Sequence, residues 1–339
     1  MSAYVDRSGT IKLVFIALLY YSLSIGLTFY QKWFIKAYKL PLLVVCGHYL
    51  IKYVAAFICR FTYEVLYTKR LRVSLSQQLR WLIPIGVCAS LDIGLSNWAL
   101  EYVTVSLYTM AKCSSIIFIV GFSLILRLER WRPSLGLETG FIAFGLVLFT
   151  WKSSQMDLTG LMLVELATAC TGIRWTVSQL VMQREEKAIR HPLDMIVHVQ
   201  PWMMIPIVPM IIIFEGPEMS WDTVFSFEEV YDPAFVMVLV GIGGVLAFCM
   251  EFSEYLLLVN TSGITLNIFG IAKEIATLLL AHYVNHDTFS SLNTMGLCLC
   301  FAGMILHGMN KRRPRIPIKS AESSFNDDAE KLLMEDADD

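Results

Sequence analysis

The chain has 339 residues, of which 56% are hydrophobic and 17% are charged, and its formal net charge is -2. A typical soluble domain carries about 25% charged residues, so this composition excludes the soluble globular class and indicates a membrane protein with several spans. The first apolar run is long enough to cross a bilayer, and no small-residue cleavage site follows it. We therefore expect it to stay in the protein as a span and not to be removed as a signal peptide.

Apolar runs of about 20 residues predict membrane-spanning helices, and the chain has ten such runs. They cover residues 11–34, 40–62, 80–100, 103–126, 135–152, 158–181, 195–214, 233–257, 261–284 and 288–309. We therefore expect an all-α membrane protein. Residues 1–10 form a short cytoplasmic N-terminus in this prediction. Residues 310–339 turn from basic to acidic with few large apolar side chains, which predicts a disordered cytoplasmic tail.

Basic residues around the spans indicate the orientation in the membrane. Eighteen of the 27 basic residues fall on one side, and only Lys36, Lys39 and Lys152 fall on the other. Because cytoplasmic loops are enriched in lysine and arginine, we expect both termini in the cytoplasm. The long loop over residues 215–232 contains six acidic and no basic residues, which fits the opposite side. The glycosylation sequon at Asn260 lies in a predicted cytoplasmic hairpin, so we expect it to be unmodified.

Several functional classes have little support in the sequence. All eight cysteines lie in or beside apolar segments, so we interpret them as free packing thiols and expect no metal site. Without a nucleophile–base constellation or a long hydrophilic loop, we expect no enzyme activity, no cofactor and no nucleic acid partner. In the tail, Leu332-Leu333 after Asp328 has the form of an acidic dileucine sorting signal for an adaptor, although such short patterns also arise by chance.

Basic residues inside the spans are the main functional signal. After the flanking residues are assigned, Lys32, Lys52, Lys112, Arg174 and Lys273 remain within spans. A charge at mid-bilayer costs roughly 2.5–3.5 kcal/mol on insertion scales, so such residues suggest function. Lys52 is the exception, because we expect it to extend along its helix to the membrane interface. Lys112 is the tenth residue of its span and lies roughly 13–14 Å deep.

Small and polar residues accompany the two deep lysines. Lys273 shares one helical stripe with Gly263, Asn267, Gly270 and Thr277, and Lys112 shares a face with Tyr108 and Ser115. Such stripes face protein or a cavity and not lipid. The alternative is that Lys273 and the adjacent Glu274 form a structural pair that only fixes helix packing.

An internal echo relates the two lysines. Residues 96–106 (SNWALEYVTVS) resemble residues 253–263 (SEYLLLVNTSG), and each segment precedes a helix with a central lysine. Lys32-Trp33 and Arg174-Trp175 form a second echo. We therefore predict two five-helix repeats, residues 11–152 and 158–309, which have opposite topology because five is odd. Lys112 and Lys273 would then converge at the midplane, with Lys32 and Arg174 near opposite mouths.

Two deep ammonium groups favour binding of a phosphate or diphosphate. In an empty site they would need carboxylates, for which the spans and hairpins offer Asp92, Glu165, Glu251, Glu254 and Glu274. Asp92, Glu254 and Glu274 are the charge partners that we predict. Nearby aromatic residues could stack on a base or sugar, although most aromatics at span ends are interfacial anchors. They are Tyr30, Trp33, Trp98, Tyr108 and Trp175.

Four segments together suggest a family: LSNWALEYVTVSLYTMAKCSSIIF (95–118), VNTSGITLNIFGIAKEIATLL (259–279), GIRWTVSQLVMQ (172–183) and YQKWFI (30–35). They resemble the solute carrier 35 nucleotide-sugar transporters, which share a superfamily with the plastid triose-phosphate transporters. The resemblance covers residues 10–310 and is greatest to the C subgroup, which includes the Golgi GDP-fucose transporter. It implies ten helices in two inverted repeats (the drug/metabolite transporter fold), and it carries the family's basic binding residues onto Lys112, Lys273 and Arg174.

The resemblance also implies a function, the exchange of a cytosolic nucleotide-sugar for a lumenal nucleoside monophosphate. GDP-fucose against GMP, supporting fucosylation in the Golgi or the endoplasmic reticulum–Golgi intermediate compartment, is the leading prediction. Plastid phosphate antiporters have arginine where Glu274 stands, and the GALNK motif of GDP-mannose transporters reads FGIAK over residues 269–273. Both differences disfavour those substrates. A non-transporting accessory protein and an exchanger of another phosphorylated solute remain alternatives, and the oligomeric state stays open, a homodimer included.

Overall fold

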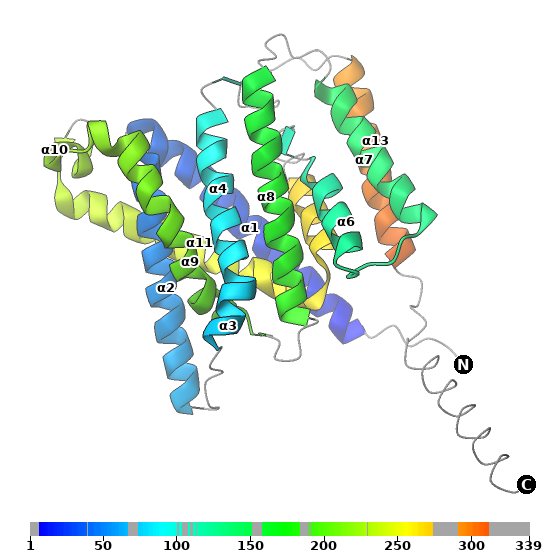
Figure 1. The fold of residues 1–339 in the computed structure, drawn as a ribbon, viewed down its shortest axis with the longest axis horizontal. Helices are drawn as coiled ribbons and strands as arrows, with labels where there is room; N and C mark the ends of the chain where they lie inside the picture. The colour runs from blue at the N-terminus through cyan, green and yellow to red at the C-terminus, as the bar shows by residue number, and fades with distance from the viewer. Residues whose placement is uncertain are drawn as a thin grey trace, which may run out of the picture.

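The structure is a computed structural model, and Figure 1 shows a bundle of packed helices. It describes residues 7–38, 40–66, 74–99, 102–103, 108, 111–112, 114–150, 158–183, 189, 191–228, 230–273 and 291–311. Within these ranges, five helical segments are long and apolar enough to cross a membrane by length and composition. The expectation of a helical, multi-pass membrane protein is therefore met, while the count of ten spans and the cytoplasmic termini stay predictions.

Every predicted span overlaps a helix. The longer helices are α1 (Arg7–Ala37), α2 (Pro41–Leu66), α4 (Ile83–Ala99), α6 (Ser115–Ile125), α7 (Pro133–Thr150), α8 (Leu158–Gln183), α9 (Pro192–Met210), α11 (Pro233–Asn260) and α13 (Ser291–Lys311). Shorter pieces are α3 (Leu75–Gln77), the π-helical η1 (Gln78–Leu82) and η2 (Ile211–Glu215), the 3-10 helix η3 (Gly216–Glu218) and α10 (Trp221–Val224). Residues 263–273 are also helical. Parts of the spans predicted at 103–126 and 261–284 lie outside the described residues.

Proline sets several helix boundaries. Pro41, Pro133, Pro192 and Pro233 each begin a helix, where the missing N–H group costs nothing because the first turn has no acceptor for it. The interior of α9 also contains prolines, at positions 201, 206 and 209, and the π-helical turn η2 follows directly. A proline inside a helix removes a backbone hydrogen bond, so irregular turns are expected near this run.

The acidic loop between α9 and α11 is folded. It contains η3, α10 and a short hairpin of β1 (Ser226–Phe227) and β2 (Val230–Tyr231), in which Ser226 pairs with Tyr231. The Phe227 ring stacks on Phe34 of α1 at 5.5 Å. The Tyr38 hydroxyl donates a hydrogen bond to the Val224 carbonyl oxygen at 2.7 Å. The loop is therefore docked on the end of α1.

Helices far apart in sequence pack in pairs. α7 lies along α13, α2 along α9, α4 against α8 and α9, and α11 against α1 and α2. The α7–α13 pair stands at the right of Figure 1, beside the rest of the bundle. Each of these pairings joins a helix before residue 152 to one after residue 158, so the two halves of the chain pack against each other.

Two glycines bring the α7 and α13 backbones into close contact. A Cβ atom on Gly145 would lie 2.6 Å from the carbonyl oxygen of Gly296 and 2.9 Å from the amide nitrogen of Cys300. A Cβ atom on Gly303 would lie 2.9 Å from the carbonyl oxygen of Glu138 and 3.2 Å from the amide nitrogen of Ile142. The two contacts are reciprocal: each glycine faces the residues three and seven positions before the other glycine in the sequence. A constant offset of 158 residues therefore relates positions 138, 142 and 145 on α7 to positions 296, 300 and 303 on α13. We call this interface the glycine seam.

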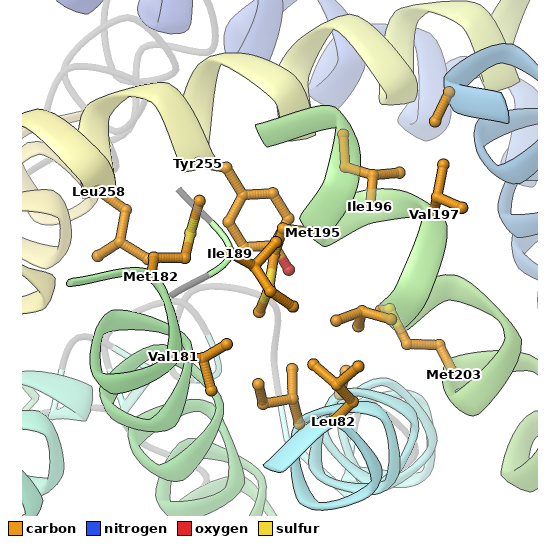
Figure 2. Packing of buried hydrophobic residues seen from close by; sticks show 14 of the residues in the cluster. Leu82, Val181, Met182, Ile189, Met195, Ile196, Val197, Met203, Tyr255 and Leu258 are labelled. Carbon is orange, nitrogen blue, oxygen red and sulfur yellow. The ribbon is translucent and has the colours of Figure 1, made fainter. Parts of the chain in front are cut away.

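An apolar plug fills one end of the bundle, where α8 and α11 finish and α9 begins. Figure 2 shows Leu82, Val181, Met182, Met195, Tyr255 and Leu258 pointing toward one another from η1, α8, α9 and α11. Each of these side chains is buried. These side chains belong to one cluster of buried, mutually packed residues, so the plug is a major part of the core.

Polar contacts join α2 and α9 at both ends. At one end the Glu215 carboxylate accepts hydrogen bonds from the backbone amides of Leu42 and Leu43, the latter at 2.9 Å. These amides belong to the first turn of α2, which lacks intrahelical acceptors. At the other end Arg60 forms an ion pair with Asp194. The two helices are therefore fastened as an antiparallel pair.

Candidate functional site

A cavity of about 450 Å³ lies at the centre of the bundle, between the plug and the N-terminal end of α2. Its polar and charged lining includes Ser24, Thr28 and Gln31 from α1, His48, Tyr49 and Lys52 from α2, and Asp92 from α4. The list continues with Tyr108, Lys112, Ser115, Thr171, Arg174, Glu251, Glu254, Asn267 and Lys273. Both halves of the chain contribute, so the cavity exists only in the assembled bundle.

Lys112 lies in this cavity, as predicted from its depth in the fourth span. Its Nζ is 2.5 Å from Oδ1 of Asp92 on α4, and it lies 5.7 Å from the centre of the Tyr108 ring. The Lys112 side chain keeps 24% of its surface exposed. The ammonium group therefore has a resident acid and still reaches the open cavity, where a solute could compete for it.

Lys273 enters the same cavity from the opposite half of the chain. Its Nζ donates a hydrogen bond to the Ser24 hydroxyl of α1 at 3.2 Å. One helical turn or two before it, Gly270 and Asn267 also line the cavity. Asn267 links the two deep-lysine segments, because its Oδ1 accepts a hydrogen bond from the Ser115 hydroxyl at 2.9 Å. The predicted convergence of the two lysine-bearing helices on one cavity is therefore present.

Glu251 is the most heavily contacted acid of the cavity. Its Oε2 lies 2.7 Å from Lys52 Nζ and accepts a hydrogen bond from Gln200 Nε2, also at 2.7 Å. Its Oε1 lies 3.6 Å from a terminal nitrogen of Arg174. The expectation that Lys52 extends to the membrane interface is therefore wrong, since the residue is only 7% exposed and is paired inside the bundle. Glu251, 199 residues away in the sequence, supplies the partner that a buried ammonium group needs.

The remaining predicted residues divide into three groups. Of the predicted charge partners, Asp92 pairs with Lys112 and Glu254 lines the cavity within electrostatic reach of Arg174 and Lys273. Glu274 and the side chain of Lys32 lie outside the described residues. Glu165 accepts a hydrogen bond from the Ser114 hydroxyl at 3.0 Å.

Two of the five predicted aromatics, Tyr108 and Trp175, line the cavity. The Arg174 guanidinium lies 4.7 Å from the Trp175 ring centre. Trp33 and Trp98 are 47% and 39% exposed, which fits the interfacial role that we considered for them. Tyr30 instead donates a hydrogen bond to the Leu239 carbonyl oxygen at 2.6 Å.

Two glutamines close the bundle beside the plug. Gln179 of α8 accepts a hydrogen bond from the Gly263 amide at 2.8 Å. Gln183, one turn later, donates to the carbonyl oxygens of Leu258 and Thr261 at 2.5 and 3.3 Å. We call these contacts the glutamine latch. They tie the end of α8 to the hairpin after α11, a contact that sequence reasoning missed because nothing local in a glutamine pair specifies its partner.

The cavity can therefore bind an anionic polar solute. Within the described residues it is lined by four basic side chains, Lys52, Lys112, Arg174 and Lys273, and by three acids, Asp92, Glu251 and Glu254. Ammonium and guanidinium groups bind phosphate oxygens by charge-assisted hydrogen bonds. The three acids offset part of this positive charge when no solute is present, which lowers the cost of burying the cations.

Comparisons with known proteins agree with this chemistry. The sequence pattern described as the Triose-phosphate Transporter family matches residues 11–308. A probable sugar phosphate/phosphate translocator of Arabidopsis thaliana is 28% identical, over 91% of this chain and 75% of that protein. UDP-xylose transporter 1 of Arabidopsis thaliana is 22% identical, over 75% of this chain and 78% of that protein.

A solved crystal structure shares the fold. It matches with a TM-score of 0.57 at 16% sequence identity, over 90% of this chain and 98% of that chain. Because the family pattern covers almost all of the described helices and the same residues enclose a basic cavity, the chain belongs to the Triose-phosphate Transporter family.

Proposed function

We propose that the protein is an antiporter that exchanges phosphorylated sugar compounds across an endomembrane. The observation that supports this function best is the central cavity, whose four basic side chains come from both halves of the chain. A dianionic phosphate needs several donors at once, and a buried site with fixed cations supplies them without water. The related transporters make phosphorylated sugars the leading class of solute.

In this proposal, Lys112, Lys273 and Arg174 bind the phosphate groups. Tyr108, Asn267 and Gly270 line the cavity beside the two lysines and form the part of the site that contacts the remainder of the solute. Lys32 serves the mouth at the end of α1. Asp92 and Glu254 neutralise the cations in the empty carrier.

Alternating access would use two repeats of five helices, residues 11–152 and 158–309. The reciprocal glycine seam supports this division, because a two-fold exchange of the halves maps one contact onto the other. The other packing pairs support this division too. If α1, α2 and α4 correspond to α8, α9 and α11 in that order, exchange of the two halves converts the α4–α8 pair into the α11–α1 pair. The same exchange converts the α4–α9 pair into the α11–α2 pair. Helix pairs that exchange in this way are expected of inverted repeats.

At a finer level, we propose a nucleotide-sugar as the transported solute, with GDP-fucose against GMP in the Golgi or the intermediate compartment as the leading pair. Glu274 after Lys273 supports a solute other than a triose phosphate. A cytoplasmic position of both termini and of the α8–α11 end follows from the basic flanks of the spans. The plug and the glutamine latch would then be the closed cytoplasmic gate.

A second candidate is exchange of a sugar phosphate for inorganic phosphate. The 28% identity to a probable sugar phosphate/phosphate translocator favours it. A third candidate is an accessory membrane protein that does not transport. An unchanged cellular phenotype after loss of the charge at Lys112 or Lys273 would support it.

Reconstitution distinguishes these candidates. The purified protein is placed in liposomes that are preloaded with GMP, UMP or inorganic phosphate, or left empty. Uptake of labelled nucleotide-sugars and sugar phosphates is then measured. We expect uptake of a nucleotide-sugar only into liposomes that contain the matching nucleoside monophosphate. Uptake of sugar phosphates only against phosphate would replace the first candidate by the second, and no exchange-dependent uptake across the panel would refute transport.

A further inference from the structure

Four helices meet at the Glu251 carboxylate. Glu251 on α11 is 1% exposed, and its contacts are Lys52 from α2, Gln200 from α9 and Arg174 from α8. Gln200 is fully buried, and its amide acts as a fixed donor. One cation is enough to neutralise a buried carboxylate, so the second cation beside Glu251 can also interact with other anionic groups, of which Glu254 is in reach.

The two cations do not share this carboxylate equally. Lys52 and Gln200 both bind Oε2 at 2.7 Å, which is the distance of a charge-assisted hydrogen bond. Arg174 lies 3.6 Å from Oε1, which is beyond hydrogen-bond distance. Among the described residues, Oε1 of Glu251 and Nε of Arg174 have no hydrogen-bond partner although both atoms are buried. Lys52 is therefore the closer ionic partner of the acid, and the Arg174 guanidinium keeps a donor, Nε, that no described group binds.

Arg174 faces the cavity in this arrangement. It lines the cavity wall together with Lys52 and Glu251, and its guanidinium lies 4.7 Å from the centre of the Trp175 ring. A guanidinium with unused donors can bind a phosphate in the two-pronged geometry that arginine favours. If Lys52 were absent, Arg174 would be the nearest described cation to Glu251, and the carboxylate would draw it into a direct ion pair.

We propose that Lys52 is a positioning residue for anion binding: its ammonium group neutralises Glu251, and Arg174 thereby stays available to bind the phosphate of the solute. This inference rests on the proposed function, because it assigns a role within the same anion site. It adds Lys52, Glu251 and Gln200 to the residues that control affinity, although none of them needs to touch the solute.

The test compares four forms of the full-length protein in detergent: wild type, Lys52→Met, Lys52→Met/Glu251→Gln, and Lys52→Arg. Dissociation constants for GMP and for inorganic phosphate are measured by thermal-shift titration at constant ionic strength. We expect Lys52→Met to weaken both by about tenfold or more, the scale of one hydrogen bond to a charged group. The double variant should return to within about twofold of wild type, because residues of one ion-pair network do not act additively. Lys52→Arg should return to a similar affinity, because it keeps the positive charge.

Restoration of affinity by a second substitution is what a merely structural role of Lys52 would not produce. Affinity of Lys52→Met equal to wild type, or a double variant as weak as the single one, would overturn the inference while leaving anion binding itself intact. If Lys52→Met does not give a monodisperse protein, Glu251→Gln decides: equal or tighter binding supports the inference, and binding weakened about tenfold overturns it. If the wild type binds neither probe, the proposed function fails and the inference fails with it.

Discussion

The glycine seam and the cavity wall are both interfaces between the two halves of the chain, and different forces hold them together. At the seam, Gly145 and Gly303 bring backbone against backbone, so no side chain can move to change the contact. At the cavity wall, side chains from separate helices meet as ion pairs such as Lys112–Asp92 and Lys52–Glu251. The first contact is fixed by shape, whereas the second can be exchanged for contacts with a solute.

This difference indicates how one bundle can combine a rigid helix interface with a binding site whose contacts change. Close-packed backbones transmit force and tolerate little change in volume. Ion pairs around a cavity can lose one partner and gain another of the same charge at small net cost. We therefore expect substitutions at the seam to change stability without changing affinity, and substitutions at the cavity wall to change affinity foremost.

The largest expected effect is on affinity, at Lys112. Replacing it by methionine removes a charge-assisted donor from the anion site, which is worth about 1.5–3 kcal/mol, or roughly 10- to 100-fold in the dissociation constant for GMP. Thermal-shift titration measures it. The control is Arg132→Met, a basic residue whose side chain is 45% exposed and is not part of the cavity lining. Equal affinity of the Lys112 variant and the control would remove Lys112 from the site.

The next effect is on stability, at the seam. Gly145→Ala and Gly303→Ala each place a methyl group within 3.0 Å of a backbone atom, so we expect each to destabilise the protein by about 1–3 kcal/mol. Gly140→Ala on the same helix is the matched control, because no described atom lies within 4 Å of its added Cβ. Unfolding in denaturing detergent measures the difference. A strong effect at one seam position and none at the other would break the proposed reciprocity.

The smallest effect concerns the glutamine latch. Gln183→Met removes the hydrogen bonds to the Leu258 and Thr261 carbonyl oxygens, which contribute about 1 kcal/mol, so the closed end should open about five times more often. A cysteine at the buried position 258, in a variant without the native cysteines, reports opening through its rate of maleimide labelling. Asn260→Ala is the control, because the bond that Asn260 makes among the described residues goes to the Leu256 carbonyl oxygen of its own helix. An unchanged rate would show that the plug alone closes this end.

Much of the fold followed from the sequence because a bilayer imposes length and apolarity on each helix. The same reasoning predicted that Lys112 and Lys273 share a cavity and offered Asp92 as one of several acids that could pair with them, since a deep charge must have polar company. It misassigned Lys52, because the side chain was expected to be long enough to reach the membrane interface. His48 and Tyr49 on the same helix also line the cavity, and this polar face of the helix could have indicated that Lys52 points into the bundle.

Pairings across the bundle could not be predicted. Helical periodicity gives the buried face of a helix but does not identify the helix that covers it. Glu251 was one of five candidate acids, and its choice of Lys52 depends on how α2 and α11 cross. The glycine seam was missed for the same reason, because single glycines in apolar helices are common and only the packed partner reveals the close approach.

The fastening of α2 to α9 has a consequence for biosynthesis. Leu42 and Glu215 are 173 residues apart, so α2 leaves the ribosome long before the carboxylate that caps its first turn is made. Until then its leading amides and Arg60 have to be satisfied by lipid headgroups, water or an insertion chaperone. A chain that stopped before residue 194 would therefore leave both ends of α2 without the partners that hold them in the finished protein.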